Sequence, residues 1–229
     1  MNKILQDSVR IALTGGLVAL ALSPRLEASG FSVPELSAAG LSTANAMVAN
    51  PNEIGAFAYN AAAMSFHDTS SVALGGLLIN MNLSVDNASG SHDSNAPEWV
   101  AAPLFQAAVK VSDKWRVGLG ATTPFGLETR WDQGTFPLLS GSRTLTIPSV
   151  GTISVPTGNE PTTSLLQVLD ITPTASYRVN DLVSVSAGLD YYCSKQAELD
   201  SSLAELQGRG TGVGWNLGLR FRKDAWSLG

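Results

Sequence analysis

Residues 30–66, GFSVPELSAAGLSTANAMVANPNEIGAFAYNAAAMSF, separate an apolar N-terminal stretch from a series of alternating segments. They are rich in Ala, Gly, Ser and Asn, carry only the charges of Glu35 and Glu53, and show no sustained period of two. Small, weakly polar side chains bury too little apolar surface to form a core of their own. We therefore predict that this segment fills the inside of a structure whose wall is built by the residues that follow.

The wall is predicted from segments in which apolar and polar residues alternate, the pattern of a strand with one apolar face. In residues 213–222, Val213, Trp215 and Leu217 alternate with glycine and asparagine. In residues 72–85, the odd-numbered positions form the predicted apolar face. Alternation predicts strands at residues 72–85, 104–112, 115–123, 167–179, 183–194 and 213–222, and the start of another at 226–228.

Short turns and long polar segments separate these strands in alternation. The turns are residues 112–114, 180–181 and 223–224, and the long segments are 86–98, 127–165 and 197–210. We predict a strand pair within residues 145–155 and a short helical turn within 197–210. Pro124, Phe125 and Gly126 interrupt the third strand, and since proline removes a ladder donor, we predict a kink or bulge there.

A soluble β-sandwich also alternates, but its outer face is usually rich in Lys, Glu and Thr. Here the polar face is mostly small or hydroxylated, with few charges such as Lys110, Asp170 and Arg220, which suits a lumen filled with protein and water. Aromatic residues near strand ends suit the girdles of a membrane wall. We predict an all-β fold, a transmembrane antiparallel β-barrel with an N-terminal plug in its lumen, because lipid requires a closed wall.

The apolar stretch at residues 11–22 spans about a dozen residues, which matches a signal peptide rather than a membrane-spanning helix of ~20. We predict a signal peptide at residues 1–28, cleaved after Ala28, and we retain a buried core helix as the alternative. Residues 29–66 then form the plug and 67–229 the wall. Bacterial single-chain barrels have an even number of strands, at least eight, so about six full strands predict the N-terminal half of an incomplete barrel.

Composition excludes several classes of function. Of the 229 residues 14% are charged, against about 25% in soluble domains, and the formal net charge of −5 with no basic patch argues against nucleic acid. His67 and His92 each stand beside an aspartate, but neither forms a cluster, so we predict no metal, no cofactor and no enzyme. A barrel hydrolase is the distant alternative.

Four stretches of the chain resemble the FadL/TodX-type (OMPP1) outer-membrane transporters of long-chain fatty acids and aromatic hydrocarbons. They are GFSVPELSAAGLSTANA (30–46), AFAYNAAAMSF (56–66), EWVAAPLFQAAVKVSDKWRVGLGATTPFGLETRW (98–131) and ASYRVNDLVSVSAGLDYY (175–192). The resemblance covers nearly all of the mature chain but only about half of a family member. It implies a fourteen-stranded barrel of the bacterial outer membrane, with a hatch in the lumen and passive uptake of hydrophobic molecules. Implied partners are outer-membrane lipid and the barrel-assembly machinery.

The resemblance also implies roles for particular residues. The family's Asn-Pro-Ala hatch motif falls on Asn60, Ala61 and Ala62, without its proline. The kink of the third strand, where the family releases its ligand sideways, falls on Pro124 and Gly126. The outer loop at 197–210 is shorter than in typical fatty-acid transporters, which leaves the substrate open.

An apolar solute needs a dry, mostly apolar pocket rather than a water-filled pore. Candidate ligand-binding residues are Phe31, Leu41, Met47, Phe57, Met64 and Phe125. The alternative for each is that it only packs the hatch against the wall. The alternative to transport is a non-transporting structural or adhesive outer-membrane barrel fragment.

Overall fold

A computed structural model describes residues 32–50, 53–156 and 158–229. The predicted signal peptide (1–28) and the candidate Phe31 lie outside the described residues. Within them no helix is both long and apolar enough to cross a membrane. Three short helices precede the strands: α2 (Ala38–Ser42), η1 (Ile54–Ala58) and η2 (Ala61–Phe66).

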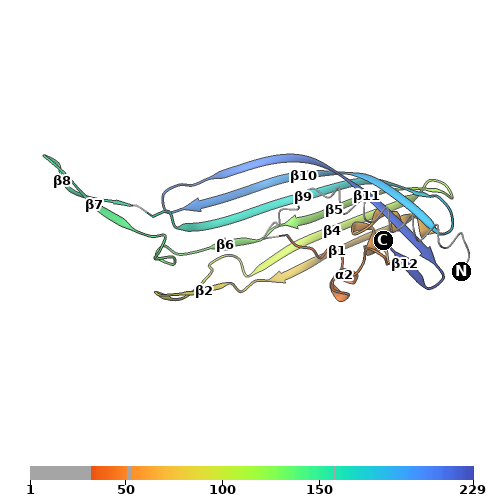
Figure 1. Ribbon diagram of the computed structural model, residues 1–229, viewed down its shortest axis with the longest axis horizontal. Coiled ribbons are helices and arrows are strands. Elements are labelled where there is room, and N and C mark those ends of the chain that lie inside the picture. Colours follow the sequence, from red (N-terminus) through yellow and green to blue (C-terminus); the bar gives the residue numbers. More distant parts are fainter. Residues whose placement is uncertain (1–31, 51–52, 157) are drawn as a thin grey trace, which may run out of the picture. The chain divides into compact units, whose positions relative to one another are not determined.

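One long antiparallel sheet dominates the described residues (Figure 1). Its strands, in order across the sheet, are β1 (Ser71–Asn80), β4 (Trp99–Lys110), β5 (Trp115–Phe125), β9 (Pro161–Arg178), β10 (Val183–Ser201), β11 (Gln207–Lys223) and β12 (Trp226–Leu228). A short strand, β6 (Glu128–Arg130), also pairs with β9. Two hairpins stand apart: β2 (Ser84–Asn87) with β3 (Gly90–Asp93), and β7 (Ser142–Ile147) with β8 (Gly151–Pro156). The latter confirms the predicted strand pair.

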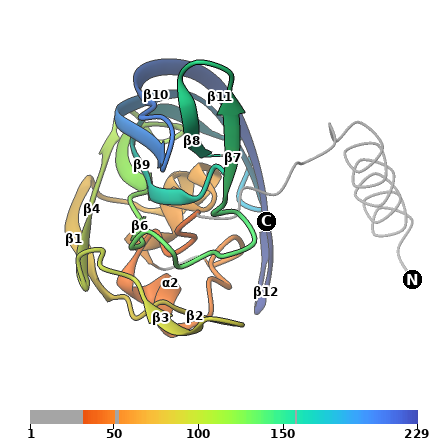
Figure 2. The same cartoon turned by 90° about the vertical axis from the view of Figure 1, so that its left-hand side faces the viewer.

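The sheet curves around the helices without closing (Figure 2). In the described residues β1 and β12 are its two edges, and no ladder joins them. Consecutive long strands pair as antiparallel neighbours, as a sequence of hairpins requires. The predicted all-β, antiparallel and incomplete barrel is confirmed.

The two faces of the sheet differ as the alternation of the sequence predicts. On β11, Val213, Trp215, Leu217 and Leu219 are 60–74% exposed on the outer face, whereas Arg220 on the inner face is fully buried. Burial alternates in the same way over residues 115–120 of β5, 173–177 of β9 and 183–191 of β10. Monomeric soluble proteins rarely expose so large a contiguous apolar surface.

The predicted strand at residues 72–85 needs two corrections. β1 ends at Asn80, and Val85 belongs to the separate hairpin of β2 and β3. The outer face of β1 consists of even-numbered residues, with Val72, Leu74 and Leu78 69–83% exposed. Directly paired residues share a face, and Leu74 pairs with Phe105 of β4. The error arose because apolar residues occupy both faces of β1, so alternation alone could not distinguish them.

The predicted helical turn within residues 197–210 is wrong. β10 continues to Ser201 and β11 begins at Gln207, so the two strands extend toward each other across a five-residue turn. Backbone N–H groups of Leu199 and Ser201 donate to the carbonyls of Leu206 and Ala204, at 2.9 and 2.8 Å. A single helical turn has an unfavourable free energy of nucleation, and no packing offsets it here. Extending an existing ladder adds a hydrogen-bonded pair without a new nucleus.

We expect Leu217→Arg to impair assembly into lipid vesicles by ~2–4 kcal/mol if the residue lies near the midplane, because an outward arginine must be desolvated in lipid. Asn216→Arg is the control, since Asn216 lies one residue away on the inner face, where its amide donates to Asp190. Folding yield in vesicles, followed by electrophoretic mobility without heating, measures both. Equal losses for the two variants would contradict the assignment of faces.

Candidate functional site on the inner face of the sheet

Residues 32–50 and 53–66, here called the helical segment, lie on the inner side of the sheet (Figure 2). η2 contacts β5, β9, β10 and β11, while η1 contacts β1 and β4. The segment is held by apolar packing, by hydrogen bonds from side chains of the wall, and by close approach to wall glycines.

Asn60 joins three parts of the chain. Its side-chain oxygen accepts from the N–H of Ala62 at 3.1 Å, which caps η2. Its amide nitrogen donates to the carbonyls of Val48 (3.1 Å) and Leu219 (3.0 Å). Leu219 lies beyond the short ladder between β11 and β12, which pairs only residues 221–223 of β11. Asn60 therefore satisfies a wall carbonyl that β12 does not reach.

Two wall serines continue this contact along η2. The hydroxyl of Ser184 on β10 donates to the carbonyl of Ala62 at 2.7 Å. The hydroxyls of Ser65 and Ser176, the latter on β9, are hydrogen-bonded to each other. All three serines are fully buried, so a lost partner would leave a polar group without solvent.

Glycines on the inner face make this approach sterically feasible. A Cβ atom added to Gly218 would lie 2.5 Å from the side-chain oxygen of Asn60 and 2.4 Å from the hydroxyl of Ser186. One added to Gly118 would lie 2.6 Å from the sulfur of Met64. Non-bonded carbon atoms are in optimal contact only at about 3.5–4.0 Å. The small residues of the inner face thus have a packing role.

Two buried arginines bind backbone carbonyls of the helical segment and its exit. Arg220 of β11 donates to the carbonyls of Ala49 (2.6 Å) and Asn50, and to the hydroxyl of Ser227 (2.8 Å). Arg116 of β5 donates to the carbonyl of His67 through two nitrogens, at 2.8 and 3.0 Å. Alternation places both arginines on the inner face, but nothing in the sequence indicates their partners.

The candidate ligand-binding residues separate into two groups. Met47, Phe57 and Met64 are buried together in a core with Ala56, Ala63 and Ala108. Leu41 is 55% exposed and does not join this core, and Phe125 is half-buried at the end of β5. The arrangement is a packed contact between helical segment and wall, in line with the packing alternative for these three residues.

The interruption of the third strand coincides with an irregular ladder. The register of β5 against β9 shifts between two pairs: Thr122 pairs with Asp170, and Phe125 pairs with Val168. The chain therefore advances three residues on β5 but only two on β9. An extra residue on one strand is the signature of a β-bulge. The carbonyl of Pro124 accepts from the backbone N–H of Val33 at 2.8 Å. The start of the helical segment is thus tied to the bulge.

The two histidines lie in different parts of the structure and make different contacts. His67 stacks edge-on against Phe57 with ring centroids 4.9 Å apart, and His92 contacts the hydroxyl of Ser89 in the β2–β3 hairpin. Across the part of the chain that the structure describes, no three His, Cys, Asp or Glu side chains are grouped to hold a metal ion. What the site does hold is a protein segment.

Comparisons with known proteins agree with this fold. Residues 19–147 match the family described as outer membrane protein transport protein (OMPP1/FadL/TodX). Among solved structures, a FadL homologue of Pseudomonas aeruginosa is similar, with a TM-score of 0.58 and 18% sequence identity over 86% of this chain. The match covers 50% of that protein, so the chain spans about half its length. The comparison with curated proteins gave no match.

We expect Asn60→Ala to loosen the helical segment by about 1–3 kcal/mol, because it removes the cap of η2 and leaves the carbonyl of Leu219 unsatisfied. Hydrogen exchange of backbone amides in residues 61–66 measures the loss of protection. Asn82→Ala, at an exposed asparagine outside the strands, is the matched control. Unchanged protection in Asn60→Ala would show that the apolar core and the serine contacts hold η2 without Asn60.

We expect Gly218→Ala to displace η2 from the wall, because the new methyl group would overlap Asn60 and Ser186. Gly120→Ala places the same methyl group on the inner face of β5, where the nearest atom is 3.7 Å away. Protease cleavage within residues 32–66 of the folded protein should accelerate in the first variant and remain near the wild-type rate in the second. Similar rates in both would contradict the close approach at Gly218.

Proposed function

Because the chain belongs to the family of outer membrane transport proteins (OMPP1/FadL/TodX), we propose that it is part of an outer-membrane channel that takes up hydrophobic molecules. The observation that carries the proposal is the helical segment packed inside a wall whose outer face is apolar. Long-chain fatty acids and aromatic hydrocarbons are the proposed substrates. The family is one of transport proteins, and we propose no catalytic role.

The arrangement of turns supports one orientation in the membrane. Residues 112–114, 180–182 and 224–225 form short turns at one end of the sheet, and the long segments lie at the other. Outer-membrane barrels have short periplasmic turns and longer outer loops. The end of η2, beside Arg116 and the short turns, then lies toward the periplasm. We propose that residues 1–28 direct export and that the barrel-assembly machinery inserts the wall.

We propose that the helical segment acts as the hatch of this channel. Its links to the wall are hydrogen bonds and apolar contacts, such as those of Asn60, Ser184 and Arg220. Each typical hydrogen bond contributes only about 0.5–1.5 kcal/mol net, so the segment can shift when a ligand replaces part of the packing. Met47, Phe57 and Met64 are the proposed apolar surface that a ligand would reach.

The proposed lateral exit lies at the bulge of β5. There Pro124 supplies no ladder donor, and the ladder between β5 and β9 skips a residue. The bond between Val33 and Pro124 connects the start of the hatch to this weak point. A shift of the hatch would therefore change the backbone at the bulge of β5. Phe125 and Gly126 would lie beside the proposed exit.

A disulfide between hatch and wall tests the proposal. We expect the double variant Ser65→Cys, Ser176→Cys, built on Cys193→Ser, to lose uptake of labelled oleate and toluene by cells when oxidised. Because the two hydroxyls are already in contact, the cysteines should bridge with little backbone movement. A reducing agent should restore uptake in the same cells, which is the internal control.

Two outcomes would contradict the transport proposal. Uptake that is insensitive to oxidation, with the disulfide verified by mass spectrometry, would show that the hatch need not move. Absence of uptake in cells with a correctly inserted wild-type protein would favour the structural or adhesive alternative.

A further inference from the structure

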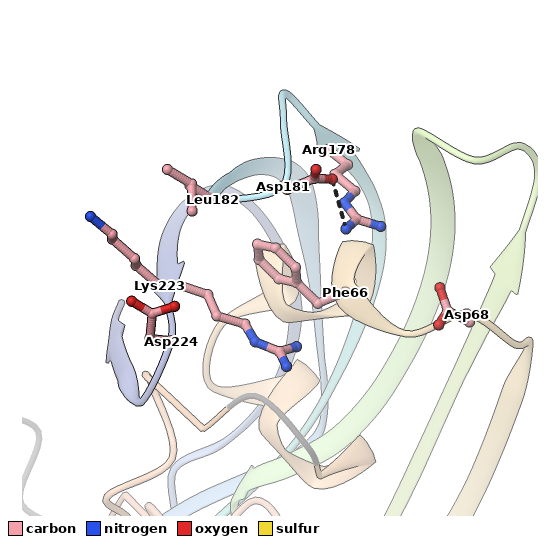
Figure 3. Close-up of a pocket in the computed structure, with 8 residues that line it drawn as sticks. Phe66, Asp68, Arg178, Asp181, Leu182, Lys223 and Asp224 are labelled. Carbon is pink, nitrogen blue, oxygen red and sulfur yellow. Dashed lines mark hydrogen bonds and ion pairs between the residues drawn. The ribbon is translucent and has the colours of Figure 1, made fainter. Parts of the chain in front are cut away.

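A second site lies at the end of the sheet that carries the short turns. It is a pocket of about 410 Å³ between the end of η2, the β9–β10 turn and the β11–β12 turn. Figure 3 shows Phe66 at its centre, with Asp181 and Leu182 on one turn and Lys223 and Asp224 on the other. Pockets that bind small molecules range from about 300 to 1,000 Å³, so the space suffices for a small organic ligand.

Guanidinium groups gather around the ring of Phe66. Those of Arg178, Arg220 and Arg222 lie 5.7, 5.8 and 5.9 Å from its centroid. Arg178 is paired with Asp181 at 3.1 Å, and Arg220 donates to neutral carbonyl and hydroxyl oxygens. Within the described residues no ion pair is formed by Arg222 or Lys223. All three distances fall within about 6 Å, the range in which the face of an aromatic ring attracts a cation.

The charges of the pocket set the charge of its ligand. Arg178, Arg222 and Lys223 line it together with three acids, and Arg220 beside Phe66 adds a fourth cation. The excess is one positive charge. This net positive charge attracts an anion, and one negative charge on the ligand is enough to neutralise it. A singly charged anion fits this balance.

The apolar side chains of the pocket indicate the chemistry of the uncharged part of the ligand. Phe66 and Leu182 provide an aromatic and an aliphatic surface next to the cations. A carboxylate accepts the parallel N–H donors of a guanidinium in a bidentate fashion, and an organic body would pack on the two apolar side chains. We propose that this pocket binds the carboxylate of a small organic acid, with Arg222 as its principal donor.

The inference rests on the proposed function only for its location, which would be the periplasmic end of the channel. Phe66 is the last residue of η2, so a ligand seated against it would also hold the end of the helical segment in place. The pocket is thus separate from the apolar core of Met47, Phe57 and Met64, and its occupant is recognised by charge.

The test uses the full chain folded in zwitterionic detergent micelles, with 4-fluorobenzoate as the probe and ¹⁹F NMR titration as the measurement. We expect Arg222→Gln to weaken binding about tenfold, the loss typical of one charge-assisted hydrogen bond. Arg209→Gln removes the same charge from an exposed position near the other end of β11, and should leave the affinity within about twofold. Equal affinities for Arg222→Gln and wild type would overturn the site.

A second variant keeps the proposal testable if Arg222→Gln fails to fold. Asp224→Asn removes a repelling charge, and asparagine tolerates the positive φ of 53° at this position. We expect it to bind the probe more tightly, which loss of a merely structural contact would not produce. Unchanged or weaker binding would contradict the proposed charge balance.

Competition distinguishes the sources of the anion. Benzoate should displace the probe more effectively than inorganic phosphate or phosphatidylglycerol added to the micelles. Stronger displacement by either phosphate would overturn the assignment to a carboxylate. Because binding is measured on the purified protein, it can hold even if the disulfide test abolishes the transport proposal, and the reverse is also true.

Discussion

The close approach of η2 to the inner face of β9, β10 and β11 is the contact on which the rest of the described structure depends. The contact involves Gly218, Ser176 and Ser184 on the wall. It also involves Asn60, which caps η2 and donates a hydrogen bond to the wall carbonyl of Leu219. With the helical segment packed against it, the inner face excludes water at these serines, so their hydroxyls need partners within the protein. Wall and helical segment complete each other.

The wall recognises the helical segment mainly through its backbone. Arg220 and Ser184 donate to carbonyl oxygens of the segment, and Arg116 donates to the carbonyl of His67, which directly follows it. A carbonyl is present whatever the side chain, so such contacts fix the position of the segment while leaving its side chains free to vary. Arginine suits this role because its donors form a rigid fork and it keeps its charge. This accounts for two buried arginines that form no ion pair with a carboxylate within the described residues.

The same sheet separates two kinds of chemistry along its length. Toward the middle, Met47, Phe57 and Met64 form an apolar contact between the helical segment and the wall. At the end with short turns, Phe66 is surrounded by guanidinium groups, and the surface selects by charge. One helix, η2, spans both, since Met64 and Phe66 are two residues apart. Any movement of η2 would therefore affect the apolar contact and the charged pocket together.

Local pattern in the sequence predicted the central parts of β4, β5, β9, β10 and β11 and the outer face of β11, because side-chain direction in a strand alternates with a period of two. It missed β6 and the parts of β4, β9, β10 and β11 that extend beyond the predicted strands. It failed at β1, where Val72 and Leu77 lie on opposite faces and both are apolar, and at residues 197–210, where pairing of β10 with β11 overrides a weak helical tendency. Only the tertiary structure decided which groups meet on the inner face. Asn60 and Leu219 are 159 residues apart, and Arg220 and Asn50 are 170 apart. The curvature of the sheet around the helical segment brings such pairs into contact. A pattern with a period of two describes only neighbouring residues and cannot identify partners at that separation.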